Sequence, residues 1–527
     1  MKGLAMSHAR IATAIFLSTA AVLLALHGQR MVFTNDEGIV LESAQRMAAG
    51  GRIYVDFFGY MSPGSYWLQE LVFRLFGFAL WTGRLIVILD FAAQCALVYW
   101  LAARLSSGRA ATAVTLTFAG FQIADPAFLT SAHRWDSATF ALAGLCAAVG
   151  AGNQKLRWAA SGALMAAAVW CTPSMAIVAA VIALWLAASR VRREQLAPFA
   201  GGAAAIGLAG IGALISTGSL GAFFGQMAWL RQNYSGVNVL PYGSIIGGYR
   251  ALFEGTHGGL ETTLRVVLVA CVALPAILPP IAILLGGLTW WRAKTQGSAG
   301  DQRDALALLL PAAAGLAMTA FPRADVMHLA FIAALPYTLA GIALARLLPA
   351  RAASWLAMGT ILMAATFASN YVRGWRETTR VSSPAGMLRV PAEQAADMQR
   401  LIREVRPGAG LFVYPYMPVE YFLTQARNPT RYSYLMPGMM TRTQEIEALG
   451  QLQAQPPEWL LFMQPSPEEF LRVFPNGAGL DWHFPELESW MQGNYRPTEA
   501  PAVHVGGYRL WRRIAGHEAV QAAAHAN

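Results

Sequence analysis

Apolar stretches of membrane-spanning length follow one another over the first 371 residues, and this pattern decides the solvent in which the chain folds. A helix that crosses a bilayer needs about 20 mostly apolar residues. With 56% hydrophobic and 13% charged residues, the composition excludes a single soluble globule. The sequence therefore predicts a polytopic α-helical membrane protein of about 11 spans, at residues 11–27, 81–103, 110–128, 135–152, 158–171, 174–189, 197–216, 261–289, 305–320, 328–347 and 353–371.

Basic residues predict the orientation of these spans. A cytoplasmic N-terminus places the three lysines and many arginines in short inside loops, as the positive-inside rule requires. These residues are Lys2, Arg10, Arg104, Arg109, Lys155, Arg157, Arg190, Arg192, Arg193, Arg292, Lys294, Arg303, Arg346 and Arg351. An odd number of spans then puts the loop after the first span, residues 217–260 and the chain beyond about residue 372 on the outer face. The pI near 9.6 follows from this topology and does not indicate nucleic-acid binding.

The N-terminus resembles a secretory signal, because Lys2 and Arg10 precede the apolar run from Ile11 to Leu26. No small-x-small cleavage site follows before Arg30, so we expect an uncleaved signal anchor.

The pattern changes after Tyr371 to short apolar runs, such as 411–414 and 459–462, that alternate with polar helical stretches. We expect a transmembrane part at residues 1–371, a linker at 372–390 and a small α/β domain of about 140 residues, on the outer face, at 391–527.

Charged residues at the outer ends of the predicted spans form three clusters, and such residues are often functional because they are costly there. The first follows span one and holds Asp36, Glu37 and Asp56; the second opens span four with His133, Arg134 and Asp136; the third lies between spans nine and ten with Arg323, Asp325 and His328. Ordinary explanations stay open: the acidic pair marks a helix end, Asp136 caps a helix or pairs with Arg134, and Asp325 neutralises Arg323.

Several motifs around the first cluster resemble the first outer loop of the membrane glycosyltransferases of the C superfamily, which include protein O-mannosyltransferases and lipid A aminoarabinose transferases. The motifs are Asp36-Glu37-Gly38, Ala49-Gly50-Gly51, Tyr54-Val55-Asp56, Pro63-Gly64, Leu75-Phe76-Gly77 and Arg84. The similarity extends loosely over residues 1–370. It implies that Asp36 is the catalytic aspartate and that residues 64–76 lie along the outer interface.

The resemblance implies a reaction in which a sugar on a polyprenyl phosphate passes, at the outer face, to an acceptor in the cell envelope. Asp36 would deprotonate the acceptor as general base while it attacks the anomeric carbon from the face opposite the phosphate, with inversion. Glu37 and Asp136 are supporting acidic candidates. Asp56 and Tyr234 are candidates for contact with the acceptor or the sugar.

The chain departs from the aminoarabinose transferases where these have phosphate-binding lysines: it reads Met61-Ser62-Pro63 and Cys171-Thr172-Pro173-Ser174, and no lysine is expected on the outer face. The donor phosphate must then be met by arginine or histidine. We name Arg323 and His328 first, then Arg134 and His133, and Arg231 as an outside candidate.

Tyr414, Tyr416, Tyr421 and Tyr432 in the predicted outer domain could stack on sugar faces, although most tyrosines of a small domain serve its core. No closed metal motif is present, and a divalent metal is left open as a cofactor.

Two other classes of function stay open: a lipid or solute transporter or flippase, and a noncatalytic envelope-assembly protein. Transporters usually show internal repeats, and none stands out here. The resemblance to bacterial members implies a multi-pass protein of the bacterial inner membrane whose partners are a polyprenyl-linked sugar, membrane lipids and an envelope glycan, lipid or protein.

Overall fold

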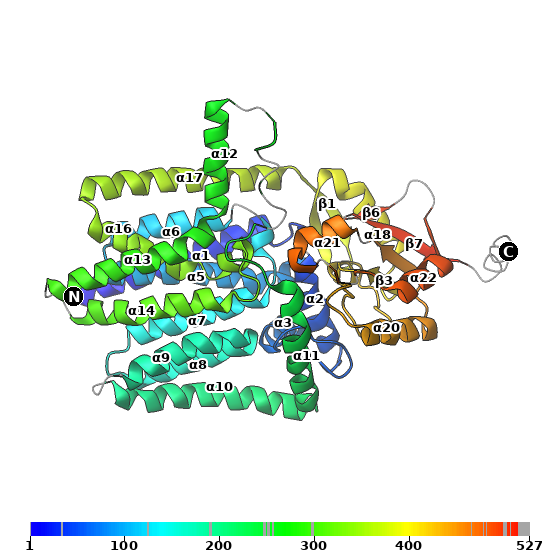
Figure 1. Cartoon of the computed structure of the whole chain (residues 1–527), viewed down its shortest axis with the longest axis horizontal. Helices are drawn as coiled ribbons and strands as arrows, with labels where there is room; N and C mark the ends of the chain where they lie inside the picture. The colour runs from blue at the N-terminus through cyan, green and yellow to red at the C-terminus, as the bar shows by residue number, and fades with distance from the viewer. Residues whose placement is uncertain are drawn as a thin grey trace.

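The structure is a computed structural model that describes residues 2–32, 35–123, 126–188, 192–245, 249, 253–255, 258–296, 300–464, 466–477, 479–480, 482–498, 503–505 and 507–514. It is mostly helical, with a smaller α/β part that follows the helical bundle (Figure 1). Arg190, which we assigned to an inside loop, and the end of the predicted outer domain from residue 515 lie outside the described residues.

The bundle consists of long helices that run side by side (Figure 1). Because these helices are apolar around much of their circumference, they suit a lipid solvent in which every backbone polar group must be satisfied within the helix. They are α1 (Lys2–His27), α5 (Leu85–Leu105), α6 (Gly108–Gln122), α7 (His133–Val149), α8 (Lys155–Cys171), α9 (Ala176–Ala187), α10 (Leu196–Ser216), α13 (Leu274–Thr295), α14 (Gly300–Thr319), α16 (Ala334–Leu347) and α17 (Ala350–Arg376).

Five helices in the described part of the chain are long and apolar enough to cross a membrane: Ser7–His27, Leu85–Leu105, Arg193–Ser216, Leu274–Thr295 and Ala350–Arg376. Two shorter apolar helices are Pro173–Ala187 and Ala334–Leu347. The number of about 11 spans therefore stays a prediction.

Two of the predicted spans are divided in the structure. The stretch 261–289 belongs to α12 (Gly259–Val272) and α13, and α12 runs across the direction of the bundle (Figure 1). Pro275, in the first turn of α13, lacks the N–H that would continue the preceding helix. The stretch 328–347 is divided between α15 (Val326–Phe331) and α16.

Small residues allow α8 and α10 to approach closely. A Cβ added at Gly162 would lie 1.9 Å from the Phe199 carbonyl oxygen, and one added at Gly202 would lie 1.9 Å from that of Ala159. Close backbone approach of this kind supplies the van der Waals contact that holds membrane helices together.

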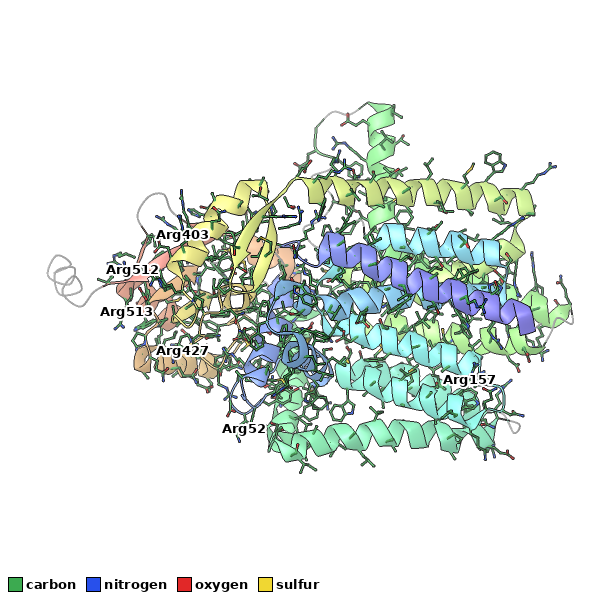
Figure 2. The ribbon with its side chains drawn as sticks, turned by 180° about the vertical axis from the view of Figure 1, so that it is seen from behind. Arg52, Arg157, Arg403, Arg427, Arg512 and Arg513 are labelled. Atoms are coloured by element: carbon green, nitrogen blue, oxygen red, sulfur yellow. The ribbon has the colours of Figure 1, made fainter. Side chains whose placement is uncertain are left out.

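Helices that lie where the bundle meets the α/β part are α2 (Asn35–Ala48), α3 (Gly64–Phe76) and α11 (Leu220–Asn238) (Figure 1). The short helix α4 (Leu80–Gly83) follows α3 in the chain. Figure 2 shows Arg157, which we assigned to an inside loop, at the opposite end of the bundle from Arg403, Arg427, Arg512 and Arg513 of the α/β part. Arg157 and the α/β part thus lie at opposite ends of the bundle, and the orientation of the spans stays a prediction.

Residues 378–514 form what we call the C-terminal region. A hairpin of β1 (Thr378–Ser383) and β2 (Gly386–Pro391) occupies most of the stretch predicted as a linker. A second sheet has the order β3-β4-β7-β5, with β6 beside β7; β3 and β4 are parallel, and β7 is antiparallel to its neighbours. Its strands are β3 (Leu411–Tyr414), β4 (Trp459–Phe462), β5 (Tyr495–Pro497), β6 (His504–Val505) and β7 (Tyr508–Arg513).

Every residue of β3 and β4 is buried: β4 lies between β3 and β7, and β3, although it is the edge strand of this sheet, is covered by the rest of the protein. The helices of this region are α18 (Ala395–Glu404), α19 (Val419–Thr424), α20 (Arg442–Ala454), α21 (Pro467–Val473) and α22 (Pro485–Asn494). Its core is continuous with the first outer segment, because Phe422 of α19 stacks on Phe73 of α3 with ring centroids 5.3 Å apart. The C-terminal region is thus packed onto the end of the bundle.

Candidate active site

A cavity of about 320 Å³ lies where the bundle, the first outer segment and the C-terminal region meet. The predicted site residues that line it are Asp36, His133, Arg134, Tyr234, Arg323 and His328. The C-terminal region contributes Tyr416, Met436, Met439, Val473 and Phe474. The three clusters, which lie about 100 and 190 residues apart in the chain, therefore meet at one cavity.

Asp36 stands in the first turn of α2, where free N–H groups and the helix dipole favour a carboxylate. Its side chain is accessible at the cavity, and its Oδ1 atom accepts a hydrogen bond from the hydroxyl of Tyr416. Asp36 is therefore a carboxylate that a substrate in the cavity can reach.

Glu37, the next residue, does not line the cavity. Its two carboxylate oxygens accept from Nε and Nη2 of Arg84, each at 2.8 Å, and both side chains are fully buried. Arg84 also donates to the carbonyl oxygens of His27, at 3.1 Å, and of Arg30. This pair fastens the start of α2 to the end of α1 and the start of α5.

Asp136 lies inside the bundle instead of at the cavity, although its neighbours His133 and Arg134 reach it. Its carboxyl group is close to Asp90 and Ser65, and not paired with Arg134 as one reading of the sequence suggested. Because helical residues advance by about 100° each, one turn of α7 sends these side chains to different sides.

Asp56 also lies away from the cavity. It forms a surface ion pair with Arg52 at 2.8 Å, and the two side chains are 42% and 51% exposed. The hydrogen bonds from the Arg52 side chain and backbone hold the pKa of Asp56 below its usual range. The expected contact between Asp56 and a substrate in this cavity is not supported by its position.

Arg323 is held in place by three groups. Its Nε donates to Asp325 at 3.0 Å, its Nη1 to Asn238 at 2.9 Å and its Nη2 to the carbonyl of Val473 at 3.3 Å. The guanidinium also lies 5.1 Å from the centroid of the Phe474 ring. Most of its donors are therefore already used within the protein.

Asp325 links Arg323 to His328. Besides the ion pair with Arg323, it accepts from the backbone N–H of His328 at 2.9 Å and contacts Nδ1 of that ring at 2.8 Å, so it caps α15. Burial acts to raise its pKa, but the hydrogen bonds and charge of His328 together with Arg323 hold the pKa below its usual range. The structure thus contains the Arg323–Asp325 ion pair that the ordinary interpretation of the sequence predicted.

Arg134 is also buried, with 8% of its surface exposed, but it is less engaged. In the part of the chain that the structure describes, the Arg134 side chain makes a hydrogen bond from Nη1 to the Thr319 carbonyl oxygen at 3.2 Å. A guanidinium carries five N–H donors. Arg134 is therefore the cavity arginine with the larger capacity to bind a ligand, and His133 beside it is fixed by a 2.8 Å contact between Nδ1 and Thr172.

Reasoning from sequence missed Tyr60 and Asn238 and did not separate Tyr416 from the other outer tyrosines. Tyr414, Tyr421 and Tyr432 are core residues with at most 2% exposure, whereas Tyr416 lines the cavity. Tyr416 comes two residues after the buried parallel strand β3, and the carboxyl ends of parallel strands often carry functional side chains. Its position just after this strand was the sequence signal that could have identified Tyr416 as a candidate site residue.

Aromatic rings join across one wall of the cavity. The Tyr60 ring lies 5.5 Å from Tyr234 and 5.4 Å from Tyr434, and Tyr434 lies 4.7 Å from Tyr416.

Arg231, our outside candidate for the donor phosphate, is exposed and does not line the cavity. Among the residues that the structure describes, no three His, Cys, Asp or Glu side chains are grouped in a way that could hold a metal ion.

One family of known proteins matches part of the chain. Residues 61–215 match the family described as dolichyl-phosphate-mannose-protein mannosyltransferase. No curated protein matches the chain.

Solved structures resemble the chain over nearly its whole length. The crystal structure of ArnT from Cupriavidus metallidurans bound to undecaprenyl phosphate has a TM-score of 0.55 at 15% identity, covering 96% of this chain and 98% of ArnT. Its apo state gives 0.51, again at 15% identity, covering 95% and 98%. The Archaeoglobus fulgidus oligosaccharyltransferase tethered to an acceptor peptide gives 0.49 at 12% identity, covering 98% of this chain and 74% of that one. The resemblance stated from the sequence is therefore confirmed: by a family match over residues 61–215 and by an ArnT-like fold, the chain is similar to the membrane glycosyltransferases of the C superfamily.

Proposed function

We propose that the chain is a glycosyltransferase that moves a sugar from a polyprenyl-phosphate donor to an envelope acceptor at the outer face of a bacterial inner membrane. The observation that carries this proposal is the convergence of Asp36 with Arg134, Arg323, His133 and His328 on one cavity at the end of the bundle. A carboxylate that faces cations across a cavity suits a reaction in which a hydroxyl is deprotonated and a phosphate leaves. The ArnT structure of the same fold was solved with undecaprenyl phosphate, which supports this class of donor.

In the proposed reaction Asp36 is the general base. It accepts the proton of the acceptor hydroxyl as the oxygen forms a bond to the anomeric carbon, while the bond from that carbon to the phosphate oxygen breaks. The phosphate leaves on the polyprenyl carrier with the electron pair of the broken bond. Attack from the face opposite the phosphate inverts the anomeric carbon.

Arg134 is our first candidate for the donor phosphate, with His133 and His328 beside it. The sequence placed Arg323 first among the candidates for the donor phosphate. We now place Arg134 first, because Arg323 already donates hydrogen bonds to Asp325, Asn238 and Val473. Planar bidentate donation suits arginine to a phosphate group. Arg323 then supplies charge and holds the wall of the cavity.

Tyr234 and Tyr60 are candidates for contact with the sugar or acceptor, because both line the cavity with aromatic faces. Asp56 is not retained in that role, since it is paired with Arg52 at the surface.

The test is mass spectrometry of envelope glycolipids, polysaccharides and glycoproteins from cells that lack the protein and are complemented with variants. We expect a sugar mass to disappear in the null strain, to return with the wild type and with Asp56→Asn, and to stay absent with Asp36→Asn. Asp56→Asn is the matched control, because it changes an aspartate of the same outer segment outside the cavity. Full restoration by an Asp36→Asn protein present in normal amounts would contradict the proposal and favour a transport or assembly role.

A further inference from the structure

One hydrogen bond joins the C-terminal region to the proposed general base. The Tyr416 hydroxyl donates to Oδ1 of Asp36 across a separation of 380 residues in the chain. Two further contacts hold Tyr416 in place. Its backbone N–H donates to the hydroxyl of Tyr508 at 3.1 Å, and its ring packs edge-on against that of Tyr434 with ring centroids 4.7 Å apart. The Tyr416 hydroxyl therefore approaches Asp36 from a residue that two further contacts fix in place.

Tyr416 is a donor in this contact. Burial, followed by the charge and hydrogen bond of Asp36, raises the pKa of Tyr416 well above its usual range, so the phenol keeps its proton. A hydrogen bond donated to a carboxylate stabilises the ionised form of that carboxylate.

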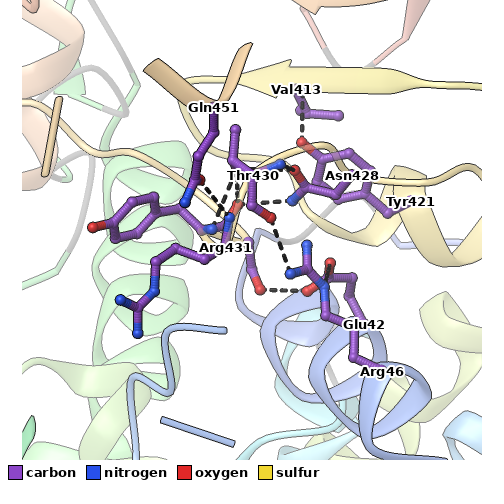
Figure 3. Close-up of polar contacts among 10 residues, drawn as sticks. Glu42, Arg46, Val413, Tyr421, Asn428, Thr430, Arg431 and Gln451 are labelled. Atoms are coloured by element: carbon purple, nitrogen blue, oxygen red, sulfur yellow. Dashed lines mark hydrogen bonds and ion pairs between the residues drawn. The ribbon is translucent and has the colours of Figure 1, made fainter. Parts of the chain in front are cut away.

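The contact belongs to a wider docking surface between the C-terminal region and α2. Next to Asp36, a Cβ added at Gly38 would lie only 2.0 Å from the backbone nitrogen of Val419, so the two segments touch through their backbones. Further along α2, Glu42 accepts from Ser433, and Arg46 donates to the Thr430 carbonyl at 3.0 Å (Figure 3). The helix that carries Asp36 is thus held over three turns by the C-terminal region.

Other groups also face Asp36. The titratable or charged side chains near its carboxylate are Tyr60, Arg134, Tyr234, Tyr416 and Tyr434. Among these, Tyr416 makes the direct hydrogen bond. Tyr434 is buried and its hydroxyl has no hydrogen-bond partner in the described structure.

We propose that Tyr416 is a positioning residue for Asp36: its hydroxyl keeps the carboxylate aimed into the cavity, so the C-terminal region completes the active site. This inference rests on the proposed function for its catalytic meaning, but the contact can be tested without a substrate.

The test uses the full-length protein in detergent and dicyclohexylcarbodiimide, which reacts with protonated carboxyl groups. Labelling of the peptide that contains Asp36 is measured by mass spectrometry as a function of pH for wild type, Tyr416→Phe and Tyr434→Phe. We expect the labelling curve of Tyr416→Phe to move to higher pH by about one pH unit, because a hydrogen bond to a charged group is lost. Tyr434→Phe removes a neighbouring hydroxyl that makes no such bond, so its curve should match the wild type.

An unmoved curve in Tyr416→Phe would overturn the inference. If Tyr416→Phe does not purify as a folded protein, Tyr416→Leu, which also lacks the hydroxyl, takes its place with the same expected shift.

The envelope assay separates the two proposals. A shifted labelling curve with a fully active Asp36→Asn protein would leave the contact standing and remove the catalytic role of Asp36. An inactive Asp36→Asn protein with an unmoved labelling curve in Tyr416→Phe would retain the glycosyltransferase and reject the role of Tyr416.

Discussion

Glu37 and Arg84 form a bidentate ion pair that is completely shielded from solvent, and Glu37 is the chain neighbour of Asp36. Because Arg84 also donates to two carbonyls at the end of α1, the direction in which α2 leaves the bundle is set at this pair. Asp36 reaches the cavity from the other side of the same helical turn. Of the two adjacent acids, one is available for chemistry and the other holds the helix.

Replacing Glu37 by Gln should destabilise the protein strongly. It leaves the Arg84 charge buried without its partner, a change that usually costs about 3–5 kcal/mol. Thermal unfolding of the purified protein in detergent measures the effect. Glu70→Gln is the control, because Glu70 pairs with the half-exposed Arg74 at 2.8 Å and such surface pairs contribute about 1 kcal/mol or less. Equal losses in both variants would show that the buried pair is not the anchor described here.

Replacing Gly38 by Ala should loosen the C-terminal region. The new Cβ would meet the backbone of Val419 and Pro418, which cannot move aside as a flexible side chain would. We expect faster cleavage of the C-terminal region in limited proteolysis of the intact protein and lower transfer activity. Gly221→Ala, in α11, is the matched control, since nothing lies within 4 Å of that position and alanine favours a helix. Wild-type proteolysis of Gly38→Ala would contradict this docking.

Replacing Arg134 by Gln should weaken binding of undecaprenyl phosphate about tenfold, because charge-assisted hydrogen bonds to the phosphate are lost. Native mass spectrometry of the purified protein with added lipid measures retention. Arg157→Gln, at the opposite end of the bundle (Figure 2), should bind as the wild type does. If Arg323→Gln but not Arg134→Gln lost the lipid, the order of candidates given by the sequence would be restored.

Glu420 should lower the stability of the folded protein as the pH rises from the ordinary pKa of a glutamate towards about 8. It is fully buried in α19, both its carboxyl oxygens lack a hydrogen-bond partner in the described structure, and burial raises its pKa to about 8. Above the ordinary pKa of a glutamate, the unfolded chain releases this proton while the folded chain keeps it. The free energy of unfolding therefore falls as the pH rises towards the folded-state pKa. Glu420→Gln removes that difference.

We therefore expect Glu420→Gln to unfold at a higher temperature than wild type at neutral pH, by about 2–3 kcal/mol in free energy, and to differ little in acid. Glu404→Gln, at an exposed position of α18, serves as control. A pH-independent difference between Glu420→Gln and wild type would mean that ionisation is not its cause.

Much of the architecture could be predicted from the sequence, because lipid imposes long apolar helices and charged residues at their ends stand out. This reasoning placed Asp36, Arg134 and His328 at one site. It could not decide which side of a helix Glu37 and Asp136 face, since one residue of error turns a side chain by about 100°. The break before Pro275 was also missed, because α12 and α13 are equally apolar.

Tyr416 could not be found for a different reason. Its partner Asp36 lies 380 residues earlier, and such a pairing depends on how the C-terminal region docks on α2. The place of Tyr416 just after strand β3 sets it apart from Tyr414, which faces the core, but this place does not reveal Asp36 as its partner.

The distance along the chain between Asp36 and Tyr416 also orders events during biosynthesis. Asp36 leaves the ribosome almost first, just behind the first helix, whereas Tyr416 and the rest of its wall emerge after the last helix of the bundle has been made. A nascent chain arrested in the membrane would carry the aspartate without the wall that faces it. The cavity around Asp36 is therefore complete only after the C-terminal region has been made and has docked on α2.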